Sequence, residues 1–183
     1  MSQSEHEYFR VRQEKAEALR SKGLDPYPAR FNRTHTSLQA LAFFEEREES
    51  HADDLIEISV GGRVMARRGM GKATFLDISD ADGDLQVMLR GNALGEKYEL
   101  LSYLDIGDWL GVKGSLFRTR TGQITLQASE FQIICKALRP LPEKWHGLTD
   151  VETRFRQKYL DLIANEDAVK AARSRSLLVS TMR

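Results

Sequence analysis

The region between Leu55 and Ile134 contains five strand-like stretches with one helical stretch between the third and the fourth, and this order most constrains the fold. In the first stretch apolar Ile56, Ile58 and Val60 alternate with polar residues, which is the two-residue period of a half-buried strand. We expect strands at about 56–67, 72–79, 84–90, 109–120 and 123–134, and a helix at 92–103. Three strands, a helix and two more strands are the order of an OB-fold, a five-stranded barrel that commonly binds oligonucleotides over its second and third strands. Another small barrel or an α+β sheet is the alternative.

Glycines and turn residues divide this region. Gly61–Gly62 interrupts the first strand without ending it, which predicts a bulge at that pair. The sequence from Asp80 to Gly83 predicts a tight turn, and Thr121–Gly122 predicts a hairpin.

Helical sequence flanks the strands on both sides. A charged amphipathic helix is expected at 3–22, a second helix at 38–48 after a cap at Thr36 or Ser37, and two more at 151–163 and from Glu166 onward. The predicted fold is mainly β, with an N-terminal helical extension at 1–54, the barrel at 55–136, a connector at 137–150 and helices at 151–183. The sequence stops inside the last helix without a capping signal, which predicts that the chain is truncated before a further domain.

Composition excludes several classes of protein. No apolar run approaches the roughly 20 residues that cross a membrane, and the charged N-terminus does not resemble a secretory signal. A single cysteine rules out an internal disulfide, and four scattered histidines argue against a structural zinc site. We therefore expect a cytoplasmic protein that does not contact membranes and holds no metal.

The two-residue period also sorts the strand residues into inner and outer faces. In the third strand Leu85, Val87 and Leu89 point inward, and in the first strand the same alternation directs Val64 and Ala66 inward. The predicted outer surface consists of Arg63, Arg67, Phe75, Gln86, Met88 and, at the strand end, Arg90. Although the net charge of the chain is zero, residues 61–75 carry four basic side chains and no acidic one.

These residue types suit single-stranded RNA. An unpaired base stacks on an exposed aromatic ring such as Phe75, and an amide such as Gln86 can both donate to and accept from a base edge. Arginine adds phosphate pairing and cation–π contact. The alternative is that the N-terminal helices cover Phe75, that Gln86 is simply solvated, and that Arg63 and Arg67 pair with the acidic segment 45–57.

Five stretches between Gly62 and Ile163, a segment of more than half of the chain, carry a resemblance: GRVMARRGMGKATFLDI, LQV, GDWLGVKGSLFRTRTG, KALRPLPEKWHGL and ETRFRQKYLDLI. In this order they resemble the motifs of the bacterial-type class II lysyl-tRNA synthetases. The last two are the most specific, because aspartyl- and asparaginyl-tRNA synthetases share the barrel and a YLDL-like segment. An aspartyl- or asparaginyl-type domain, or a stand-alone RNA-binding paralogue, remains as an alternative.

The resemblance implies that the barrel binds the anticodon stem-loop of lysine tRNA. In the family a phenylalanine stacks on the central anticodon base while an arginine and a glutamine contact it, and motif alignment assigns these roles to Phe75, Arg68 and Gln86. Gln123 stands where the family usually has a glutamate that helps to recognise the anticodon. We predict that tRNA binding persists with this glutamine and that discrimination at that contact is altered.

The resemblance also implies an enzyme whose chemistry lies outside these residues. The full-length family attaches lysine to tRNA with ATP and Mg²⁺ and acts as a homodimer. Residues 166–183 resemble only the opening helix of the first catalytic motif, and no carboxylate pair, nucleophile–base set or phosphate loop suggests another active site. We expect this chain to bind no cofactor and to be inactive alone.

Overall fold

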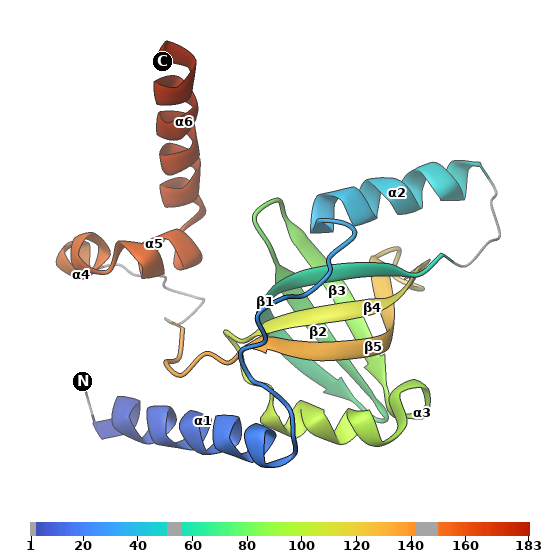
Figure 1. Cartoon of the computed structure of the whole chain (residues 1–183). Coiled ribbons are helices and arrows are strands. Elements are labelled where there is room, and N and C mark those ends of the chain that lie inside the picture. Colours follow the sequence, from blue (N-terminus) through green and yellow to red (C-terminus); the bar gives the residue numbers. More distant parts are fainter. Residues whose placement is uncertain (1–2, 51–55, 142–149) are drawn as a thin grey trace. The chain divides into compact units, whose positions relative to one another are not determined.

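The computed structural model describes residues 3–50, 56–141 and 150–183. Five strands close into a barrel in the order β1-β2-β3-β5-β4, which confirms the predicted OB-fold arrangement (Figure 1). The strands are β1 (Ile58–Met70), β2 (Ala73–Ser79), β3 (Asp84–Arg90), β4 (Trp109–Arg118) and β5 (Ile124–Cys135). The short helix α3 (Gly91–Leu94) and the 3₁₀ helix η1 (Gly95–Tyr103) stand between β3 and β4. One continuous helix was predicted there, but Gly95 adopts a positive φ of 56° that ends the α-helical turn.

β1 joins the two halves of the barrel. Its first part, Ile58–Arg63, pairs antiparallel with β4, and its second part, Arg63–Met70, pairs antiparallel with β2. The barrel closes where β3 runs parallel to β5, with Gln86 in register with Thr125. Each strand thus pairs with two others, and the sheet closes on itself.

The predicted bulge at Gly61–Gly62 is wrong. The register between β1 and β4 runs through both glycines without a shift, and the irregularity falls at Met65, between Val64 and Ala66 in the pairing with β2. The glycines serve close approach instead, since a Cβ on Gly62 would lie 3.0 Å from the carbonyl oxygen of Ser79. An extra residue at Met65 reverses which side of the sheet the following residues face.

The core fills the barrel with the inward side chains of the strands. Leu76 and Ile78 of β2 and Leu85, Val87 and Leu89 of β3 are fully buried, as their alternation predicted. Each contributes about 1.5–3 kcal/mol relative to an exposed side chain. Ala40 and Leu101 join the same core from helices that lie at opposite ends of the barrel (Figure 1).

The N-terminal helices begin and end where the sequence predicted. Helix α1 (Gln3–Ser21) is followed by Gly23 at φ 76°, and α2 (Ser37–Glu49) starts with a capping box in which Thr36 and Gln39 bond each other's backbone. Between them Phe31 lies against Gly61 of β1 and Gly111 of β4, which are partners in register. The extension therefore covers the outer side of the β1–β4 pair.

A buried ionic cluster fastens α1 to the barrel. Lys136 is 2% exposed and donates to Asp108 at 2.7 Å and to Asp105 at 2.5 Å, while Lys15 of α1 donates to Asp105 at 2.5 Å. Burial raises the pKa of Asp105, but the hydrogen bonds from Lys136 and Lys15 outweigh it and hold this pKa below its usual value. Arg12 adds bonds to the carbonyl oxygens of Ala137, Arg139 and Ile106.

Residues 141–183 form a second compact unit, whose described part holds three helices. They are α4 (Val151–Arg156), α5 (Lys158–Ala164) and α6 (Glu166–Met182). The single helix predicted at 151–163 is interrupted at Gln157, where φ is −117° and ψ is 57°. The connector predicted at 137–150 lies mostly outside the described residues. In the described part of the chain, no helix has the length and apolar character needed to cross a membrane.

We predict that Gly114→Ala destabilises the barrel. A Cβ there would overlap the backbone carbonyl of Gln127 on β5, so the β4–β5 pair must shift. The free energy of unfolding, measured with urea, should fall by about 1–3 kcal/mol, as for overpacked sites. Gly69→Ala is the control, because a Cβ on Gly69 meets no atom within 4 Å. Equal stability of the two variants would contradict the role assigned to Gly114.

Candidate nucleic-acid interface

Three rows of side chains cross β1, β2 and β3 on the outside of the barrel. Residues in register on neighbouring strands point to the same side of a sheet, so the pairing assigns the members of each row. We call these nine residues the outer face; its rows are Ala66, Asp77 and Gln86; then Arg68, Phe75 and Met88; then Met70, Ala73 and Arg90.

Phe75 lies at the centre of the outer face and is half-buried. Its partner Met88 is 2% exposed although it is not a member of the core cluster, so it is buried on the outer side of the sheet, beside Phe75. The ring of Phe75 is thus supported from one side while part of its surface stays open. Phe75 is therefore partly covered, and part of its surface stays accessible.

Gln86 is held in place by β5. Its Oε1 accepts a hydrogen bond of 2.9 Å from the hydroxyl of Thr125, its partner in the parallel pair of β3 and β5. The Nε2 group of the amide is then left to donate. Gln86 therefore presents a fixed donor in the row next to Phe75.

Arg68 forms a two-pronged ion pair with Asp77. Its Nη1 and Nη2 lie 2.9 and 2.7 Å from the two carboxylate oxygens, and about half of its side chain is exposed. Arg68 is in register with Phe75, and its planar guanidinium reaches the row of Asp77 and Gln86. The pair also cancels most of the charge at this point of the outer face.

Arg67 was predicted to share the outer surface with Phe75, but the register places it on the other side of the sheet. The irregularity at Met65 puts Arg67 in register with buried Leu76, while Arg67 itself stays exposed. Its Nη1 donates to the carbonyl oxygens of Leu101 and Leu104 at 2.8 and 3.0 Å. These carbonyls belong to the last turn of η1 and the residue after it, so Arg67 fastens η1 to the barrel.

Arg63 points outward as predicted but lies apart from Phe75. It precedes the irregularity, donates to the carbonyl oxygen of Gly107 at 2.9 Å and stacks over the ring of Trp109 at 5.3 Å. Burial lowers the pKa of its guanidinium. The structure therefore brings Arg68, Phe75, Gln86 and Met88 together, but neither Arg63 nor Arg67.

Two residues of the acidic segment 45–57 pair with cations other than Arg63 and Arg67, the partners that the sequence suggested. Glu48 binds Arg118, with its Oε1 2.9 Å from Nε, and Glu57 binds Lys113 at 2.8 Å. Residues 51–55 of this segment lie outside the described residues. Gln123 is exposed immediately before β5, two residues from Thr125. It thus stands at the edge of the Gln86 row.

Sequence reasoning missed the supporting residues of the outer face. The alternation of β2 placed Asp77 outward, but only the register shows that it reaches Arg68. Thr125 could not be linked to Gln86, because the parallel pairing of β3 with β5 has no local signal. Met70, 68% exposed beside the hairpin turn, was also overlooked.

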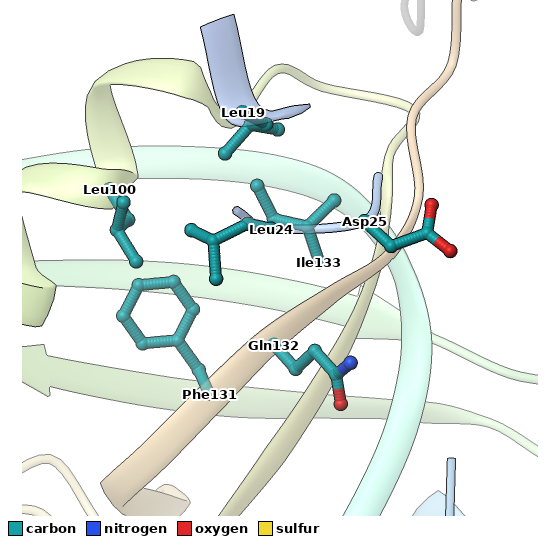
Figure 2. A pocket seen from close by; sticks show the side chains of 7 residues that line it. All are labelled: Leu19, Leu24, Asp25, Leu100, Phe131, Gln132 and Ile133. Atoms are coloured by element: carbon teal, nitrogen blue, oxygen red, sulfur yellow. The ribbon is translucent and has the colours of Figure 1, made fainter. Parts of the chain in front are cut away.

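A cavity of about 80 Å³ lies between the end of α1, η1 and β5 (Figure 2). Leu19, Leu24, Leu100 and Phe131 give it an apolar lining, and the polar ends of Asp25 and Gln132 point away from that lining (Figure 2). An apolar space without converging polar groups is a packing gap rather than a specific site.

Comparisons with known proteins agree with a nucleic-acid interface on this barrel. The family described as "OB-fold nucleic acid binding domain", under the heading tRNA anti-codon, matches residues 58–134. The chain is 50% identical over 179 residues to a lysine–tRNA ligase of Pelotomaculum thermopropionicum, which is 97% of the chain and 34% of that relative. It is 41% identical over 191 residues to the lysine–tRNA ligase of Bacillus subtilis, covering 38% of it. The chain thus spans little more than a third of these relatives.

We predict that the two neighbouring arginines contribute unequally to stability. Arg67→Ala removes two charge-assisted bonds to carbonyls and should lower the free energy of unfolding by about 1–2 kcal/mol. Arg68→Ala removes an exposed ion pair and should change it by less than about 1 kcal/mol. Urea unfolding of both variants measures the difference, and a larger loss for Arg68→Ala would show that the two side chains have been assigned the wrong way round.

Proposed function

We infer the function of this chain from the family to which it belongs, the bacterial lysine–tRNA ligases, whose N-terminal region it matches. We propose that its barrel binds the anticodon of lysine tRNA through the outer face. The observation that carries the proposal is Phe75, a large apolar ring left partly open beside a row that holds the Arg68–Asp77 ion pair and the fixed amide of Gln86. Bases of single-stranded loops are recognised by this combination of stacking and edge contacts.

The geometry favours a base that offers an acceptor to Gln86. Thr125 occupies the Oε1 of this amide, so its Nε2 is the group that meets the base. Uracil carries carbonyl acceptors on its edge, whereas the corresponding edge of cytosine carries an amino donor. A donor facing that amino group would leave two donors opposed and unpaired.

Arg68 contributes orientation to this site. Its bond to Asp77 fixes the guanidinium at the row next to Phe75, so less rotamer entropy is lost when RNA binds. Its remaining N–H groups can donate to the base or its phosphate. Asp77 therefore supports recognition without touching the RNA.

The chemistry of the ligase reaction is proposed to lie outside this chain. The resemblance implies ATP and Mg²⁺ for the full-length family, and among the described residues no group of three or more histidine, cysteine or carboxylate side chains is placed to hold a metal ion. We propose that the chain binds neither and is inactive alone, and that the full-length ligase is a cytoplasmic homodimer.

The first test is binding of the lysine-tRNA anticodon stem-loop to the chain and to Phe75→Ala. Loss of the stacking surface should weaken binding by about 1–3 kcal/mol. A stem-loop with the central uridine changed to cytidine should bind the unchanged chain more weakly, and the Phe75→Ala variant should lose part of that preference. Fluorescence anisotropy at two salt concentrations measures both.

Phe155→Ala serves as the control, because Phe155 is an 80% exposed phenylalanine of the second unit. Binding that ignores the central base and Phe75 but falls steeply with salt would reveal phosphate attraction alone. That outcome would sink the anticodon proposal.

A second prediction concerns Gln123. Gln123→Glu adds a charge that accepts hydrogen bonds only, at an exposed position beside the Gln86 row. We expect the variant still to bind the stem-loop but to change its preference among loops altered at one anticodon base at a time. Unchanged affinity and unchanged preference for every loop would exclude Gln123 from the contact.

A further inference from the structure

The third row of the outer face consists of Met70, Ala73 and Arg90. A base stacked on Phe75 does not account for these side chains. Met70 is 68% exposed, Arg90 is exposed, and small Ala73 stands between them in register with both. A long apolar side chain beside the turn of a hairpin contributes nothing to the core. Methionine is, however, a polarisable side chain that adapts to flat ligand surfaces.

The charges of the outer face point to the same row. Arg68 is bound to Asp77, so it attracts phosphate less than a free arginine would. Arg90 and the neighbouring turn residue Lys72 are exposed and have no carboxylate within ion-pair distance among the described residues. The net positive charge of the outer face therefore lies at its third row.

The spacing of the rows fits consecutive nucleotides. Neighbouring rows are two strand residues apart, which is about 7 Å along β2. Stacked bases follow each other at about 3.4 Å along a strand, so a base next to the one on Phe75 reaches the third row only when the two are unstacked. Single-stranded loops are recognised with their bases splayed in this way.

We propose that Met70, Ala73 and Arg90 form a subsite for the nucleotide adjacent to the one stacked on Phe75. The base or ribose lies on Met70 and above Ala73, whose small side chain leaves room for it. Arg90 binds the phosphate between the two nucleotides. Lys72 adds charge beside it. The subsite rests on the proposed function and assigns residues to a nucleotide beside the one on Phe75.

The test uses the full chain, the lysine-tRNA anticodon stem-loop and the variants Met70→Ala and Arg90→Gln, with Phe75→Ala in parallel. Met70→Ala should weaken binding about threefold or more with no change in salt dependence. Arg90→Gln should weaken it most at low salt and reduce the slope of log affinity against log salt by about 0.7. Leu38→Ala and Arg30→Gln are the matched controls, an exposed leucine of α2 and an exposed arginine of the extension.

Stem-loops that lack one base identify the nucleotide. Removing the base that Met70 contacts should make Met70→Ala silent, whereas removing the base on the other side of the central uridine should leave the effect of Met70→Ala intact. If Phe75→Ala weakens binding while Met70→Ala and Arg90→Gln behave like their controls, the subsite is refuted and the proposed function stands. If Phe75→Ala has no effect, the proposed function itself fails, and the subsite fails with it.

Discussion

The pairing of β1 with two partners is the constraint on which the rest of the barrel depends. Its first part is bound to β4 and its second part to β2, so every feature that bends or shifts this strand changes both halves. The extra residue at Met65 is such a feature. It sends Arg67 to the carbonyls that end η1 and Arg68 to the side of Phe75. One local irregularity thus separates an arginine that stabilises the fold from an arginine that faces the proposed ligand.

The two sides of the barrel are occupied differently. Over β1 and β4 the ring of Phe31 fills the space above the paired glycines Gly61 and Gly111, and the adjacent chain is hydrogen-bonded to Ser59. Over β2 and β3 the aromatic ring of Phe75 stays partly open. The N-terminal extension therefore covers the β1–β4 pair with its own aromatic ring. On the β2–β3 pair the ring of Phe75 stays accessible to a ligand. An RNA base on Phe75 would repeat the packing that Phe31 already makes over the glycines.

The sequence was sufficient for the strands whose alternation is regular. β3 has the predicted bounds, and Phe75, Gln86 and Met88 share a face because nothing interrupts the period in β2 and β3. The faces of the β1 residues beyond Met65 were predicted wrongly, because an irregularity without a glycine has no signal in the local sequence. The bulge was therefore predicted at the glycine pair that precedes it. Prediction also failed to link Thr125 with Gln86, because a parallel pairing between distant strands follows from barrel closure rather than from either segment. Contacts between side chains, such as Arg68 with Asp77, required the register as well.

The ionic cluster at the end of the barrel makes its first and last segments interdependent. Arg12 and the carbonyl oxygen of Ala137 are 125 residues apart in the sequence, yet α1 binds the chain as it leaves β5. Lys136, at the same exit, is buried and donates to both Asp105 and Asp108, and Lys15 of α1 shares Asp105 with it. Shortening the chain before Arg12 would therefore preserve this brace, whereas shortening it beyond Lys15 would free the exit strand and expose a charged cluster that the barrel strands alone do not enclose.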